Sequence, residues 1–82
     1  MSLPKRWREL SRTTVGSVPE RYGVYELGDA DGEVLSVEWG VLRDELKDAL
    51  AYADAEQVRW EACESERHAQ ELAAEHRERA GL

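Results

Sequence analysis

The sequence predicts a small α+β domain in which two strands, a helix, a third strand and a second helix follow one another over residues 22–80. Runs in which apolar and polar side chains alternate mark the strands, and apolar residues that recur every three or four positions mark the helices. A cluster of turn-forming residues between the first two runs predicts a hairpin. The 82 residues suffice for one modest hydrophobic core and no second domain.

The first strand is expected over residues 22–27, where Val24 and Tyr25 are strong strand formers. Residues 28–32 read Gly-Asp-Ala-Asp-Gly, and the final Asp-Gly pair favours a tight hairpin. The returning strand is rich in apolar side chains, and Gly40 is expected to end it.

The apolar spacing then changes from two residues to three or four, which predicts a helix over residues 41–54. Residues 58–63 return to a period of two. A third strand is therefore expected there, with Val58, Trp60 and Ala62 on one face.

Ser65 is a suitable N-cap for the last helix, and Gly81 is a suitable residue to end it. The apolar stripe of this helix comprises Ala69, Leu72, Ala73, His76 and Ala80. We expect His76 to be a packed, hydrogen-bonded histidine, because it lies in that stripe.

Residues 1–18 are expected to form a separate N-terminal unit, a short amphipathic helix and a loop packed on the domain. Leu3, Trp7 and Leu10 recur at helical spacing and form one stripe. The polar, β-branched segment over residues 11–19 is typical of a connecting loop. Two of its residues are expected to anchor it on the core, Val15 and Val18.

The chain is strongly acidic, with 18 Asp and Glu against 11 Lys and Arg and a formal net charge of −7. Only two of the basic residues are lysine, and Ile, Asn and Phe are absent. Acidic surfaces with little lysine stay hydrated in concentrated salt, which screens the repulsion between carboxylates. The composition therefore predicts a halophilic archaeal source, with an ordinary acidic protein as the alternative.

The charge is unevenly distributed along the chain. Residues 1–15 contain four basic residues against one acidic residue, whereas the remainder is strongly acidic. The four basic residues are Lys5, Arg6, Arg8 and Arg12. Such a segment can contact phosphate, or it can form the solvated face of a helix. In a proteome adapted to salt nearly every protein is acidic, so the net charge does not exclude a nucleic-acid partner.

The cysteine content and the hydropathy predict a cytoplasmic location without a membrane partner. The single Cys63 excludes an internal disulfide and suits a reducing compartment. No apolar run approaches the ~20 residues of a membrane span, and no secretory signal is expected. Cys63, His68 and His76 do not have zinc-site spacing, so we predict no metal site and no cofactor.

Several short motifs resemble the GIY-YIG nuclease domain. The Gly-Val-Tyr sequence at residues 23–25 is similar to the family's Gly-Ile-Tyr motif. A Leu-Arg pair at residues 42–43 opens the next helix, as it does in the family. The resemblance covers residues 19–80 and makes residues 19–82 a GIY-YIG-like domain. It implies a small three-stranded antiparallel sheet flanked by helices, in the order (α)-β-β-α-β-α.

The resemblance also implies which residues would carry the nuclease chemistry. The family uses a tyrosine as base or phosphate ligand and an arginine that stabilises charge on the phosphate. Tyr25 and Arg43 match these two residues. The second motif falls on residues 36–38 or 38–40, and either alignment lacks its tyrosine. Glu38 would also bring a negative charge close to the phosphate.

The family's metal-binding glutamate, on the last helix, falls on Ala73. Glu71 points roughly opposite the apolar stripe, and Glu75 lies on its flank. The resemblance therefore implies a degenerate, non-catalytic domain that binds nucleic acid or another protein weakly, around Tyr25 and Arg43.

Two other functions stay open on the sequence. An active endonuclease would use Tyr25, Arg43 and either Glu71 or Glu75 with Mg²⁺ or Mn²⁺. A structural module, monomeric or weakly homodimeric, would associate through a sheet edge. In that reading Tyr25 fills the edge of the core and Arg43 is a solvated residue. The three tryptophans are expected either in the core or on a stacking surface.

Overall fold

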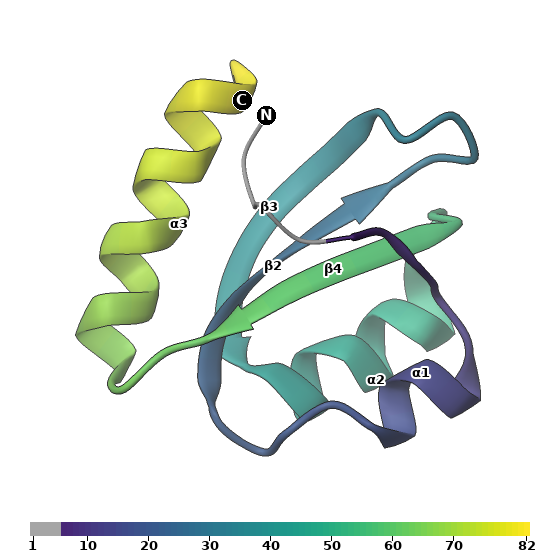
Figure 1. Cartoon of the computed structure of the whole chain (residues 1–82), viewed down its shortest axis with the longest axis horizontal. Helices are drawn as coiled ribbons and strands as arrows, with labels where there is room; N and C mark the ends of the chain where they lie inside the picture. The colour runs from purple at the N-terminus through teal and green to yellow at the C-terminus, as the bar shows by residue number, and fades with distance from the viewer. Residues whose placement is uncertain (1–5) are drawn as a thin grey trace.

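A four-stranded antiparallel sheet forms the centre of the molecule, with α1 and α2 on one face and α3 on the other (Figure 1). The computed structural model describes residues 6–82. Its elements are β1 (Arg8–Glu9), α1 (Arg12–Gly16), β2 (Tyr22–Gly28), β3 (Val34–Val41), α2 (Leu42–Tyr52), β4 (Gln57–Ala62) and α3 (Glu66–Ala80). The strands lie in the order β1-β4-β2-β3. The predicted order of two strands, helix, strand and helix is confirmed.

The predicted hairpin joins β2 to β3. The Asp29 side chain stabilises its turn, because Oδ1 accepts hydrogen bonds from the backbone N–H groups of Asp31 and Glu33, both at 2.9 Å. Gly32 has a φ of 83°, a conformation that side chains rarely permit. The strand does not end at Gly40 as predicted, because the ladder with β2 continues one residue further, to Val41.

The sheet carries a hydrophobic core on each face. On the face of α1 and α2 the buried residues are Val15, Val18, Tyr25, Leu27, Leu42, Leu46, Ala49 and Val58. On the face of α3 they are Val24, Val37 and Ala73. The two predicted loop anchors, Val15 and Val18, are both buried. Trp60 and Ala62 pack on the same cluster as Val58, as the period of two predicts.

Both ends of α3 are formed as predicted. The Ser65 Oγ accepts a hydrogen bond of 3.1 Å from the His68 backbone N–H. Gly81 ends the helix in the left-handed conformation with a φ of 74°. The predicted stripe faces the sheet, with Ala69, Ala73 and His76 buried.

The N-terminal segment differs from the prediction. Leu3 lies outside the described residues, and the part of the expected helix that can be described is extended. Arg8 and Glu9 form β1 and pair with β4, and the Leu10 N–H donates to the Glu56 carbonyl at 3.0 Å. The helix prediction is therefore wrong over residues 6–10, and the sheet has four strands instead of three.

Tertiary contacts explain why residues 6–10 are not helical, although their apolar residues have helical spacing. Without β1, the outer edge of β4 would leave its backbone groups unpaired. Trp7 lies against Gly28, where even a Cβ would come within 2.6 Å of the indole ring.

The predicted loop that follows contains one short helix, α1. Ser11 caps it, because its Oγ accepts a 3.3 Å hydrogen bond from the Thr14 N–H.

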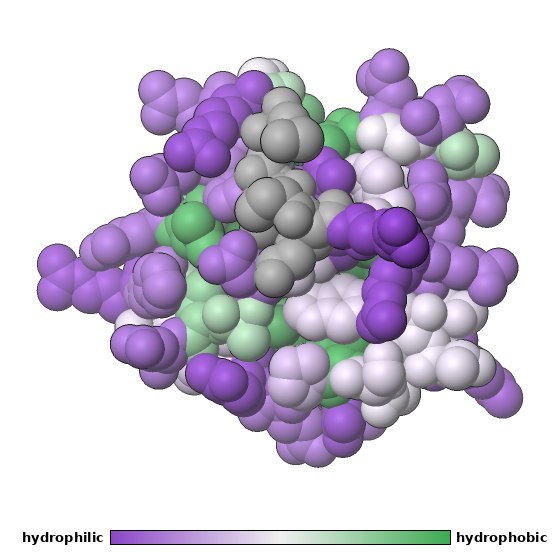
Figure 2. All heavy atoms as spheres, in the orientation of Figure 1, coloured by the Kyte–Doolittle hydropathy of each residue, from purple (hydrophilic) through white to green (hydrophobic). Residues whose placement is uncertain are grey.

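Hydrophilic side chains cover most of the face seen in Figure 2, and hydrophobic ones appear only in small, separate areas. Among the helices within residues 6–82, none has the length and apolar character needed to cross a membrane.

Candidate ligand-binding site

Tyr25 lies on β2 and faces α2. Its hydroxyl donates a 2.9 Å hydrogen bond to the Oε1 of Glu45, in the first turn of α2. Burial raises the pKa of the Tyr25 phenol well above its usual value, and the hydrogen bond to the Glu45 carboxylate raises it further. A phenol that holds its proton this firmly is a donor at neutral pH and a poor general base.

Arg43 is engaged elsewhere. Its Nε donates to the Val18 carbonyl and its Nη1 to Glu20 Oε1, both at 2.9 Å. Arg43 lines a pocket with Arg12 and Lys47, whereas Tyr25 lines a different one with Glu45 and Tyr52. The structure therefore does not bring Tyr25 and Arg43 into one pocket.

The glutamates of α3 do not approach Tyr25. Ala73, at the position expected for the metal-binding glutamate, is buried against the opposite face of the sheet. Glu71 is exposed and forms a 3.2 Å ion pair with Arg67, and Glu75 is also exposed. Within the described part of the chain, no three His, Cys, Asp or Glu side chains gather closely enough to hold a metal ion.

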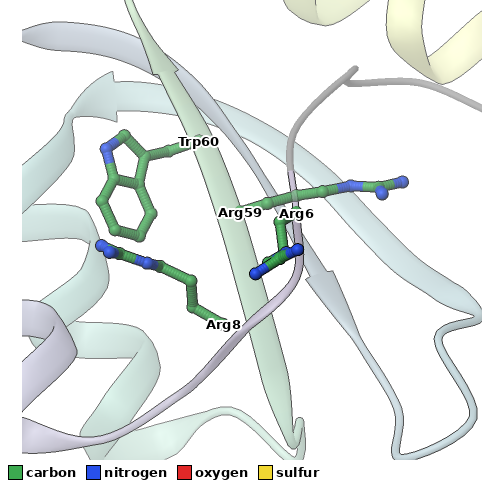
Figure 3. A pocket seen from close by; sticks show the side chains of 4 residues that line it. All are labelled: Arg6, Arg8, Arg59 and Trp60. Atoms are coloured by element: carbon green, nitrogen blue, oxygen red, sulfur yellow. The ribbon is translucent and has the colours of Figure 1, made fainter.

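Four residues from β1, β4 and the segment before β1 line a pocket of about 330 Å³ (Figure 3), namely Arg6, Arg8, Arg59 and Trp60. We call it the basic pocket. The Arg8 guanidinium lies 5.4 Å from the centroid of the Trp60 ring. Figure 3 shows Arg8 and Trp60 on one side of β4 and the Arg59 side chain directed to the other. Within residues 6–82 no ion pair engages Arg6 or Arg8.

A second group of basic residues continues from this pocket. Arg12, Arg43 and Lys47 line a pocket of about 300 Å³ between α1 and α2. β1 leads directly into α1, which packs against α2, so the stretch from Arg6 to Gly16 contributes to both pockets. We call their five cationic side chains the basic strip, Arg6, Arg8, Arg12, Arg43 and Lys47. The strip contrasts with the net charge of −7 of the whole chain.

The sequence did indicate a basic N-terminal segment, but the predicted helix concealed its geometry. Residues two apart diverge on a helix, whereas they point to the same side of an extended chain. The observed extended conformation is what lets Arg6 and Arg8 line one pocket. Trp60, which shares the face of Val58 as predicted, packs on the core under α2 and supplies the aromatic wall.

A buried ionic cluster lies on the other face of the sheet, under α3. The Glu26 side chain is fully buried, and its Oε1 accepts a 2.7 Å hydrogen bond from Arg59 Nε. The Nδ1 of His76 lies 3.5 Å from Glu26 Oε2, and neither atom has a hydrogen-bond partner within residues 6–82. The Arg59 guanidinium also stacks on Trp7, 4.0 Å from the ring centroid.

The burial of His76 is as predicted, but the hydrogen bond expected for it is not formed at Nδ1. The ionic cluster itself was missed. A signal was available on β2, because Glu26 follows Val24 on the same face of a strand whose other residues are mostly apolar. Recognising the pair required the register that places Glu26 opposite Arg59.

The fold and these pockets define a small α+β domain with helices on both faces of one sheet and a basic strip beside an aromatic ring. The chain matches, over residues 1–79, the family described as Domain of unknown function (DUF7508), and it belongs to that family. No curated protein and no solved structure matches it.

Proposed function

We propose that this chain is a non-catalytic GIY-YIG-like domain that binds single-stranded nucleic acid weakly through the basic strip. The observation that carries the proposal is the basic pocket, in which Arg8 lies over the ring of Trp60 and Arg6 lines the same cavity. The order of the elements and the Gly-Val-Tyr sequence at residues 23–25 support the family resemblance.

The chemistry of the strip suits a phosphate backbone with accessible bases. Guanidinium groups donate paired hydrogen bonds to phosphate oxygens. An aromatic ring can stack on an unpaired base, which contributes about 1–3 kcal/mol per base. A duplex keeps its bases stacked inside, so the tryptophan favours a single strand. Concentrated salt weakens the phosphate contacts and leaves stacking as the main contribution, which is why we expect modest affinity.

The residues that match the nuclease pattern argue against hydrolysis. The Tyr25 hydroxyl is hydrogen-bonded to Glu45, and Arg43 is paired with Glu20. Ala73 offers no oxygen for a metal ion and lies on the opposite face of the sheet from Tyr25. The proposed role therefore requires no Mg²⁺ or Mn²⁺.

Fluorescence anisotropy of a labelled single-stranded oligonucleotide tests the proposal, with the salt concentration varied. The double variant Arg6→Ala/Arg8→Ala is expected to bind at least about tenfold more weakly than the wild type, because it loses two phosphate contacts. A matched control removes the same charge from the exposed side of α3, Arg67→Ala/Arg79→Ala. If both double variants lost the same affinity, the effect would come from net charge alone, and the basic pocket would be refuted as a specific site.

Two further outcomes would replace the proposal. Nicking of DNA that requires Mg²⁺ or Mn²⁺ and disappears in Tyr25→Phe and Arg43→Ala would establish an active nuclease. Absence of binding together with a concentration-dependent dimer in sedimentation would establish a self-associating module.

A further inference from the structure

The basic pocket and the buried ionic cluster meet at the N-terminal segment. Trp7 lies between Arg6 and Arg8 in the chain, and its ring packs on the Arg59 guanidinium, which is bound to Glu26. We infer that binding of single-stranded nucleic acid at the basic pocket is coupled to protonation of His76 through Glu26, Arg59 and Trp7. This inference rests on the binding role proposed above and adds its regulation by pH.

The cluster is incomplete when His76 is neutral. Glu26 then has one charged partner, Arg59, at Oε1, while its Oε2 is buried with no hydrogen-bond partner among the described residues. A buried polar atom without a partner is unfavourable. A protonated imidazole 3.5 Å away supplies a charged donor for that oxygen after a small rotation of either side chain.

Protonation also changes the charge beside the basic pocket. With neutral His76 the cluster carries one negative and one positive charge, which cancel. With protonated His76 it carries a net charge of one positive unit, because two cations share Glu26. Arg59 is the member that reaches the wall of the basic pocket. A phosphate bound there experiences one additional positive charge through a poorly hydrated part of the protein.

Glu26 is the carboxylate in contact with His76, and the other charged groups around the imidazole are engaged or exposed. Arg77, the next residue on α3, donates to the Val37 carbonyl at 2.7 Å and to Glu38 at 2.8 Å. On β3 the side chains that pack toward α3 are apolar, Val37 and Trp39. Glu61 follows Arg59 on the same face of β4 and is half-buried, and the neighbouring α3 residues Glu75 and Arg79 are exposed.

The coupling also has a mechanical component. Trp7 fixes the segment that carries Arg6 and Arg8, since it stacks on Arg59 and packs against Gly28. A firmer hold of Glu26 by two cations orders Arg59 and therefore the surface on which Trp7 rests. His76 and Glu26 are thus positioning residues that act on the pocket through Arg59.

The test measures affinity for a labelled single-stranded oligonucleotide at constant ionic strength, at about pH 6 and at about pH 8. The wild type is expected to bind about three- to tenfold more tightly at the lower pH, because the additional positive charge attracts the bound phosphate. His76→Gln should lose this pH ratio. His68→Gln should keep it, because His68, the chain's other histidine, is exposed on α3.

A second measurement needs no variant. Calorimetric titration of the wild type in two buffers of different ionisation enthalpy, at an intermediate pH, should show uptake of part of a proton on binding. Binding with no proton uptake, or an unchanged pH ratio in His76→Gln, would refute the coupling and leave the binding role intact. No binding at either pH would refute the binding role and the coupling with it.

Discussion

The two faces of the sheet are built on different physical principles. Under α1 and α2 the contacts are almost entirely apolar, and Leu42 and Leu46 are fully buried. Under α3 the apolar cluster is small, and the centre is occupied by Glu26, Arg59 and His76. Hydrophobic burial depends little on pH, whereas an ionic cluster depends on the charge of each member. The first face should therefore supply stability, and the second should respond to conditions.

Breaking the ionic cluster is expected to have the largest effect. Glu26→Leu removes the buried carboxylate that Arg59 contacts at 2.7 Å, which should lower the free energy of unfolding by about 3–5 kcal/mol. Urea denaturation followed by circular dichroism measures the loss.

The double variant Glu26→Leu/Arg59→Met sharpens this result, because it removes both charges. A buried ion pair contributes little over well-packed apolar residues, so the double variant should recover most of the stability. If it remained as unstable as Glu26→Leu, stability would come from other contacts of these side chains and not from pairing of the charges.

Truncation in the apolar face should cost slightly less. Leu46→Ala is expected to lower the free energy of unfolding by about 2–5 kcal/mol, through lost burial and the cavity that remains. The loss should be the same at mildly acidic and mildly alkaline pH, in contrast with that of Glu26→Leu. Equal pH dependence of the two variants in urea denaturation would contradict the division between the faces.

The sequence predicted those features that depend on residues close together in the chain, and it did not predict those that depend on distant residues. The strands, the two long helices and the Ser65 cap depend on residues close together in the chain, and they were predicted. The N-terminal segment has the spacing of a helix, but the open edge of β4 and the space over Gly28 decide its conformation. Those features belong to residues 20 to 50 positions away.

The candidate site was harder to predict for the same reason. The ionic cluster combines β2, β4 and α3, and the basic pocket combines β4 with the N-terminal segment. Composition identified the basic residues, but only tertiary structure assigns them to a common pocket. Tyr25 and Arg43 were selected by resemblance to a family pattern, and such a match carries no information about hydrogen-bond partners such as Glu45 and Glu20.

Removing the link between the cluster and the pocket should have a moderate effect. Trp7→Ala deletes the ring that stacks on Arg59, and we expect a loss of about 1–2 kcal/mol in the free energy of unfolding, since the indole is only half-buried. Amide hydrogen exchange should accelerate in β1 and leave α2 unchanged. Unchanged exchange in β1 would contradict the role of Trp7 as the anchor of this segment.

The smallest effect near neutral pH is expected for Tyr25→Phe, on the apolar face. The substitution removes one hydrogen bond, to a carboxylate that is close to the surface, which should lower the free energy of unfolding by about 0.5–1.5 kcal/mol. The folded state raises the pKa of the Tyr25 phenol, so it holds that proton more tightly than the unfolded state does. The stabilisation by the hydroxyl is therefore complete below the usual phenol pKa of 10.0 and is lost as the pH rises above it.

Denaturation of the wild type and Tyr25→Phe across this alkaline range should show their difference in stability shrinking and then reversing sign. Absorbance titration at the phenolate band should show a tyrosine with a raised pKa in the wild type, and this tyrosine should be missing from the variant. If the difference in stability were constant with pH, the Tyr25 hydroxyl would not be held by Glu45 in solution. The phenol would then be available to a ligand, and the case against a catalytic tyrosine would lose its main support.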